Sequence, residues 1–158
     1  MVGVPRNAPW LTRRKFGLGT LLARLGDEIG MGMGFELQME EMPGHLVATF
    51  SGSDEVPGWR VAEAVWRQFN LVAEQCVRTK KDKVLIDTRR ADGKVSFLER
   101  FLLGDNSRVF AFHGIKVAFV DRLERIDPKK FGELVARNRS VDICVFSDIQ
   151  VARVWLLE

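Results

Sequence analysis

Three short apolar runs place the strongest constraint on what this chain folds into. They read "KVLID" at 83–87, "IKVAFV" at 115–120 and "VDICVF" at 141–146, and polar residues follow each one. Apolar runs of this length are too brief for helices and are typical of strands buried on both faces of a sheet. Segments with helical periodicity separate them. Because strands that alternate with helices form mainly parallel sheets, the pattern predicts an α/β fold.

A hairpin precedes these runs. "FELQMEEM" at 35–42 and "HLVATFSG" at 45–52 alternate apolar and polar residues on either side of Pro43-Gly44. Alternation of this kind predicts two half-buried strands joined by a tight turn, with the first strand antiparallel to the rest. We therefore expect an α/β domain with a mixed, mostly parallel sheet of about five strands flanked by helices.

The helices are predicted from their periodicity and their caps. A long amphipathic helix follows Pro57-Gly58 and stops near Lys80, with Phe69, Val72 and Cys76 on its buried face. One aromatic-rich helix is expected before Gly114, and the helix after residue 127 is expected to turn Phe131, Leu134 and Val135 inward. Three later helix starts carry capping signals: Ser96 with Glu99, Asp127 with Pro128, and Ser147 with Gln150.

Residues 1–33 lack the regular sequence pattern that begins at Phe35. Arg13 and Arg14 are similar to a twin-arginine export signal, but the apolar stretch that follows is short and is interrupted by Arg24. Another interpretation is that Met31 or Met33 is the natural start. We expect 1–33 to be a leader or flexible N-terminal arm, and 34–158 to form the domain. No apolar run approaches the roughly 20 residues that span a bilayer.

The composition limits the classes of partner and compartment. With 158 residues, 46% of them apolar, the chain suits one core of ordinary size. Its net charge of +3 is small, with acidic and basic residues mixed, so no nucleic-acid partner is expected. Cys76 and Cys144 fall at apolar positions and look like small buried hydrophobes, which suits a reducing, cytoplasmic setting.

Signatures of enzymes are mostly missing from the sequence. It contains no phosphate-binding loop that ends in Lys-Ser/Thr, no dinucleotide fingerprint after a strand, and no paired cysteines or histidines at metal-ligand spacing. We therefore predict no catalytic residues, no metal and no cofactor. His45 and His113 are interpreted as structural and not catalytic residues. The carboxylates at strand ends and turns are interpreted as caps and turn residues: Asp87, Asp92, Asp121 and Asp127.

The stretch "VLIDTRRADGKVSFLERFLL", residues 84–103, holds the candidate site. It is interpreted as a strand, a basic turn and a helix that starts at Ser96. Ligands gather where strands of open α/β sheets end and helices begin. Thr88, Arg89 and Arg90 are predicted to bind a partner or an anion there. Ser96 is either a phosphoacceptor or only a helix cap, and both interpretations stay open.

A family resemblance adds to this reading. The run "GIKVAFVDRLERIDPKKFGELVARNRSVDICVFSDIQVARVWL", residues 114–156, resembles the C-terminal half of bacterial SpoIIAA-like proteins, which have the STAS-type fold of anti-sigma-factor antagonists. "FELQMEEMPGHLVATFSG" and "VLIDTRRADGKVS" resemble the family's opening strands and its central strand-turn-helix. The resemblance covers about 35–157 and rests on motifs of fold.

The resemblance implies a non-enzymatic regulatory domain that binds another protein, an anti-sigma-type kinase in the better understood branch. In that branch, phosphorylation of a serine at the start of the helix after the central strand turns binding off. Ser96 stands at the similar position. The family's acidic and small neighbours of that serine are replaced here by Val95, Phe97 and Leu98.

A second function is carriage of a small apolar, lipid-like ligand. Relatives of this fold resemble lipid-carrying CRAL-TRIO proteins, and "FLERFLLGDNSRVFAF" at 97–112 would border a pocket for such a ligand. The competing interpretation is that Phe101, Phe110 and Phe112 belong to the core, because a chain of this length needs most of its large side chains to build one.

Overall fold

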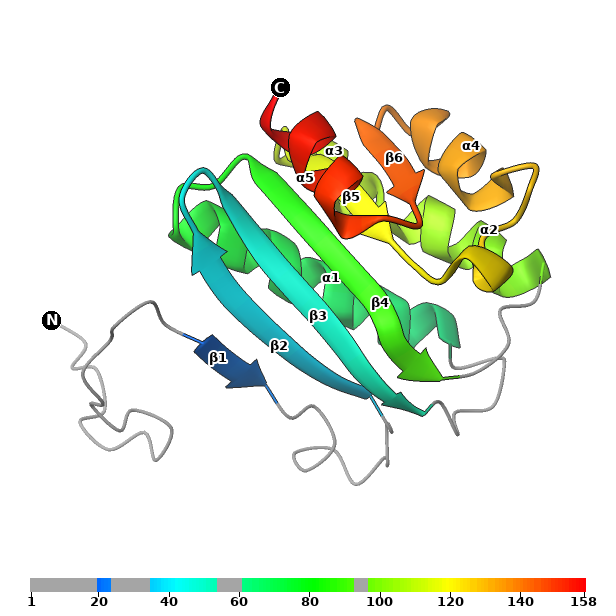
Figure 1. The fold of residues 1–158 in the computed structure, drawn as a ribbon, viewed down its shortest axis with the longest axis horizontal. Coiled ribbons are helices and arrows are strands. Elements are labelled where there is room, and N and C mark those ends of the chain that lie inside the picture. Colours follow the sequence, from blue (N-terminus) through cyan, green and yellow to red (C-terminus); the bar gives the residue numbers. More distant parts are fainter. Residues whose placement is uncertain (1–19, 24–34, 54–60, 93–96) are drawn as a thin grey trace, which may run out of the picture.

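The sheet follows the order of the sequence from one edge to the other (Figure 1). The computed structural model describes residues 20–23, 35–53, 61–92 and 97–158. Within them six strands pair in the order β1 to β6, with β3 to β6 mutually parallel and β1 and β2 antiparallel to their neighbours. The strands are β1 Thr20–Ala23, β2 Phe35–Met42, β3 His45–Ser53, β4 Lys83–Asp92, β5 Lys116–Val120 and β6 Ile143–Phe146.

The helices cover the two faces of the sheet unequally. They are α1 Val61–Arg78, α2 Phe97–Asn106, α3 Arg108–Phe112, α4 Phe131–Arg137 and α5 Ile149–Leu157, with a 3-10 turn η2 at Leu123–Arg125. Right-handed crossovers between strands added in one direction place every connecting helix on the same face. Figure 1 accordingly shows α1 behind the sheet and α5 in front of it. No helix among the described residues is both long and apolar enough to cross a membrane.

The uneven cover explains the sequence patterns of the strands. In β4, Val84 and Ile86 pack in the larger core layer beneath α1, while Leu85 packs beneath α5. Both faces of β4 are therefore apolar. In β2 only one face meets helices, so Leu37 is buried and the neighbouring Gln38 is exposed. The prediction of a mixed, mostly parallel α/β sheet, begun by an antiparallel hairpin, is confirmed.

The predicted core of α1 is also confirmed where it is described. Phe69, Val72 and Cys76 are buried at helical spacing, and burial raises the pKa of the Cys76 thiol to about 12. Cys76 and Cys144 are both free, and Cys144 is only half-buried. The sequence thus placed one cysteine correctly in the core and overstated the burial of the other.

The aromatic-rich segment before Gly114 forms two helices instead of one. The break lies at Ser107, a buried residue whose hydroxyl donates to the carbonyl oxygen of Gly104. A serine that bonds back to the preceding turn competes with the helical backbone. The expectation of one continuous helix was therefore wrong.

A cap at Asp127 would make Pro128 the first residue of the helix. Helix α4 instead begins at Phe131, three residues later. Asp127 Oδ2 accepts the Phe131 backbone N–H at 3.1 Å, and Oδ1 accepts the Lys129 N–H at 3.2 Å. Asp127 thus closes a turn ahead of the helix and still bonds its first residue. Within the helix Leu134 is 54% exposed and Val135 is buried, so the predicted inward position of Leu134 was wrong.

The cap of α5 differs from prediction by one residue. Asp148, and not Ser147, is the N-cap: its Oδ1 accepts the backbone N–H of Gln150 at 2.7 Å and that of Val151 at 3.2 Å. Both side chains are of capping type, so the sequence signal identified the helix start but not the residue that closes it.

Strand β6 lies at the edge of the sheet, and side chains of α4 and its N-cap bond its outer backbone groups. Glu133 Oε2 accepts the Val145 N–H at 2.9 Å, and Lys130 Nζ donates to the Val145 carbonyl at 3.2 Å. Arg137 Nε donates to the Ile143 carbonyl at 3.1 Å. Glu133 is buried and also pairs with Lys130 at 3.5 Å and Arg137 at 3.1 Å.

Strand β1 comes from the segment that the sequence assigns to a leader. Its four residues pair antiparallel with β2, from Thr20 opposite Glu40 to Ala23 opposite Leu37. Residues 1–19 and 24–34 lie outside the described part of the chain. The division at 33/34 into arm and domain therefore stays a prediction, with the addition that the first segment contributes a strand to the sheet.

Candidate functional site

The residues of the predicted basic turn belong to β4 itself. The strand continues to Asp92, so Thr88, Arg89 and Arg90 are strand residues, and the expectation that they form a turn was wrong. Between Asp87 and Arg90 the strand carries one residue more than β3 opposite it. Such a bulge reverses the inside-outside alternation. Ala91 therefore returns to the core layer beneath α1, which anchors the end of the strand.

Asp87 and Arg89 form a closed pair on this strand. The guanidinium donates to both carboxylate oxygens, Nε to Oδ1 at 2.9 Å and Nη2 to Oδ2 at 2.8 Å, and the Arg89 backbone N–H donates to Oδ1 at 3.1 Å. Burial of Asp87 opposes its charge, but the bonds from Arg89 outweigh burial and hold the pKa of Asp87 below its ordinary value. Arg89 is thus committed to a neighbour within the chain.

Thr88 and Asp121 link β4 to the end of β5. The Thr88 hydroxyl donates to the Val120 carbonyl at 3.1 Å, and Asp121 follows that residue directly. Asp121 is 7% exposed, and its burial raises its pKa although the Arg122 backbone N–H, at 2.8 Å, and the Arg125 guanidinium, at 3.5 Å, favour the charged form.

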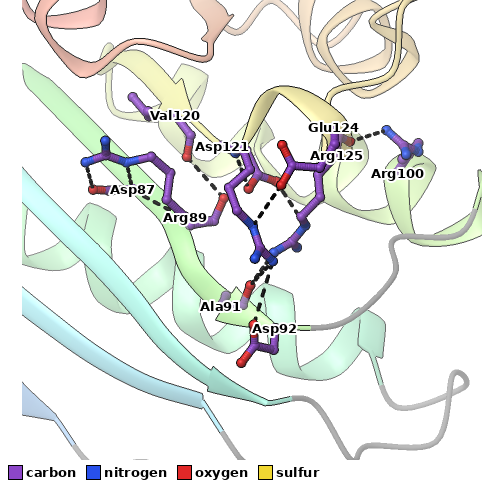
Figure 2. A network of polar contacts seen from close by, with 11 residues as sticks. Asp87, Arg89, Ala91, Asp92, Arg100, Val120, Asp121, Glu124 and Arg125 are labelled. Atoms are coloured by element: carbon purple, nitrogen blue, oxygen red, sulfur yellow. Dashed lines mark hydrogen bonds and ion pairs between the residues drawn. The ribbon is translucent and has the colours of Figure 1, made fainter.

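Two arginines after β5 tie this connection to the end of β4, as Figure 2 shows for Arg125. Arg122 Nη2 and Arg125 Nη1 both donate to the carbonyl oxygen of Ala91. Arg122 also lies 3.7 Å from a carboxylate oxygen of Asp92 and 3.9 Å from one of Glu124. From α2, Arg100 donates to the Arg125 carbonyl at 3.2 Å.

These contacts make the carboxyl edge, the ends of β4 and β5 with η2, a polar network in which arginines and carboxylates pair with one another. Of the four predicted site residues, the structure commits Thr88 and Arg89 to partners within the chain. Arg90 is exposed and pairs with no described carboxylate. Ser96 lies outside the described residues. The sequence reading missed Arg122 and Arg125, although their place just after the neighbouring parallel strand was a usable signal.

The aromatic segment gives ligand carriage no specific support. Phe110 is fully buried and packs against Phe69 with ring centroids 5.3 Å apart. Phe112 is 86% exposed, so the interpretation of it as core was wrong. One of these rings fills the core and the other faces solvent.

Comparison with known proteins adds information about the fold. No protein-family model matches the chain, and neither does any curated protein. Among solved structures, an anti-sigma factor antagonist from Mycobacterium paratuberculosis superimposes with a TM-score of 0.52, over 80% of this chain and 97% of that one. The two sequences are 11% identical, a level at which the likeness concerns the fold alone. The chain therefore has the STAS-type, SpoIIAA-like fold that its sequence motifs predict, the fold of an anti-sigma factor antagonist.

Proposed function

We propose that this chain is a non-enzymatic regulatory domain that acts by binding another protein. The observation that carries the proposal is its structural likeness to an anti-sigma factor antagonist across most of both chains. By analogy the partner is an anti-sigma-type kinase, and the analogy is one of fold.

The surface that we assign to this partner surrounds Arg90 at the carboxyl edge. Arg90 is exposed beside a network that fixes the backbone of β4 through Ala91 and Asp92, and the chain then leads to Ser96 and the start of α2. Because contacts within the chain already hold the backbone of β4, pairing Arg90 with an acidic group orders only its side chain. Arg90 is therefore the residue that we assign to an ion pair with an acidic group of the partner.

The test is a binding measurement on a purified pair. The chain is used to capture proteins from a lysate of its source organism, and the captured candidate with a kinase-type anti-sigma domain is then purified and titrated by calorimetry. Arg90→Glu is expected to weaken binding at least about tenfold, with a steep dependence on salt. Lys129→Glu, an exposed lysine ahead of α4, is the control for net charge and is expected to bind like wild type.

Two results contradict the proposal. One is that no purified anti-sigma-type protein binds the folded chain. The other is that the pair binds equally well with Arg90→Glu, which would place the contact elsewhere on the molecule.

A further inference from the structure

The opposite end of the sheet carries a row of basic side chains. We call it the amino edge: the starts of β3, β4 and β5 with the ends of α1, α3 and α5. The register pairs Lys83 with Lys116 and Leu46 with Val84, so His45, Lys83 and Lys116 stand side by side at three strand starts. Each lies two residues before a side chain packed beneath α5, so all three belong to that face of the sheet.

Among the described residues, the lysines of the amino edge are not held in ion pairs as the arginines of the carboxyl edge are. Lys80, Lys81 and Lys83 form no ion pair with any carboxylate in the described ranges, whereas Arg89, Arg122 and Arg125 all do. The buried His45 lies close enough to these cations to feel their charge. Its pKa is lowered by burial first and then, against a backbone hydrogen bond, by Arg153, Lys81 and Lys83.

Direct contacts join the parts of the amino edge. The Lys116 backbone N–H donates to the Asp82 carbonyl at 2.8 Å, and Lys116 Nζ donates to the Trp155 carbonyl in α5 at 2.7 Å. A Cβ on Gly44, in the turn between β2 and β3, would lie 3.5 Å from the Leu157 side chain. In Figure 1 that turn, the start of β4 and the end of α5 lie at the same end of the molecule.

Large apolar side chains project from the helix ends that frame these lysines. Val77 in the last turn of α1 is 54% exposed, Phe112 at the end of α3 is 86% exposed, and Leu157 at the end of α5 is 48% exposed. The amino edge therefore presents exposed apolar side chains as well as cations.

We propose that the amino edge binds the surface of a lipid bilayer that carries anionic headgroups. Its cations are mainly lysines, which protein interfaces disfavour but which an anionic bilayer attracts, since their long side chains extend toward the headgroups. Phe112, Val77 and Leu157 protrude from three separate elements, so they suit insertion among headgroups better than a single complementary pocket. This surface is separate from the one that we assign to the protein partner.

The competing explanation is that the lysines neutralise helix C-termini. α1, α3 and α5 all end at this edge, and a helix C-terminus attracts cations. Lys116 does this for α5 through its bond to the Trp155 carbonyl, with its ammonium 4.3 Å from the centre of the Trp155 ring. If that were the only role of the basic residues, the chain would not bind anionic vesicles.

Co-sedimentation of the full chain with vesicles tests the proposal. The probes are vesicles of phosphatidylcholine alone and of phosphatidylcholine mixed with an equal share of phosphatidylglycerol. Binding is expected only to the mixed vesicles. It is expected to disappear as NaCl rises from about 0.1 M to about 1 M, which shortens the Debye length from about 10 Å to about 3 Å.

Two variants and a matched control locate the surface. Each lysine near an anionic surface strengthens binding about fivefold, so Lys81→Gln with Lys83→Gln is expected to weaken it about 25-fold. Phe112→Ser is expected to weaken binding without changing its salt dependence. The control, Arg90→Gln with Lys129→Gln, removes the same charge at the other end of the sheet and should bind vesicles like wild type.

Thermal unfolding confirms that each variant is folded before it is scored. The proposal is overturned if folded wild type ignores the mixed vesicles, if the lysine and control variants bind them alike, or if an acidic protein or a nucleic acid binds this edge while vesicles do not.

Discussion

Gly104 of α2 lies so close to Gly132 of α4 that a Cβ on Gly104 would stand 2.5 Å from the Gly132 carbonyl oxygen. That oxygen is backbone and cannot move aside cheaply. The close approach sets how α4 packs on α2, and therefore where the connection from β5 that carries Arg122 and Arg125 runs.

Gly104→Ala is accordingly expected to destabilise the protein. Alanine favours a helix interior over glycine by about 1 kcal/mol, but overpacking against backbone costs more, and we expect a net loss of about 2 kcal/mol. Urea unfolding measures it. Gly132→Ala is the control, since its Cβ would lie 3.1 Å from the Arg100 carbonyl and should cost less. Equal stability of Gly104→Ala and wild type would mean that the helices are farther apart.

The two neighbouring arginines of β4 are expected to differ in their effect on stability. Arg89→Ala leaves the Asp87 carboxylate, 9% exposed, without its bidentate partner, and should cost about 1 kcal/mol after allowance for screening at the 37% exposed guanidinium. Arg90→Ala is exposed and should change stability by less than about 0.5 kcal/mol. Chemical unfolding of the two single variants decides, and equal losses would contradict the pairing.

Asp87 and Asp121 are expected to give stability opposite dependences on pH. The pKa of Asp87 is lowered in the folded state, so its contribution is full above the ordinary pKa of aspartate and is lost as pH falls through the lower folded value. The pKa of Asp121 is raised by burial, so its contribution is full below the ordinary value and is lost as pH rises through the higher folded value.

Unfolding measured between acidic and neutral pH checks this for two asparagine variants. The loss caused by Asp87→Asn should grow with pH across that range, and the loss caused by Asp121→Asn should shrink. Parallel curves for the two variants would show that neither carboxylate is perturbed as described.

Asp148, the N-cap of α5, is expected to contribute to stability, whereas the neighbouring Ser147 is not. Asp148→Ala removes an acceptor of two backbone N–H groups and should cost about 1 kcal/mol. Ser147→Ala should be nearly neutral, because Ser147 does not cap the helix. The thermal midpoints of the two variants, compared with wild type, measure the difference. A larger loss for Ser147→Ala would show that Ser147 is the N-cap.

Ser96 remains a prediction with two separable outcomes. As a plain helix cap, Ser96→Ala should cost about 1 kcal/mol, while Ser96→Asp should be nearly neutral beside a helix N-terminus. As a phosphoacceptor, Ser96→Asp should abolish binding of the partner while Ser96→Ala keeps it. Stability and calorimetric titration of both variants separate the cases, and equal binding by the two removes the switch.

The fold was predictable because its signals are local and repeated. The buried runs that begin at Val84 and Val117 and the alternation around Leu37 each identify a strand without reference to the rest of the chain. Helix starts were predicted less well, since Asp148 and Ser147 are both competent caps and only the backbone geometry selects between them.

For the candidate site, the sequence indicated only which residues lie near the strand ends, and whether they bind anything stays a prediction. The strand-end residues did gather, but sequence cannot show that a bulge carries β4 on to Asp92 or that Arg89 folds back on Asp87. Both depend on how β4 meets β3 and β5. The charge of Arg89, which suggested an external anion, is satisfied two residues away.

The bonds from Glu133, Lys130 and Arg137 to the backbone of β6 have a consequence for self-assembly. With the Val145 N–H and the carbonyl groups of Val145 and Ile143 already bonded, β6 offers few free backbone groups to another strand at that edge. Among the described strands this leaves the outer side of β1 as the sheet edge open to pairing. Two copies that met there would use the same edge of each molecule, so the association would close as a symmetric dimer and could not propagate into a fibre.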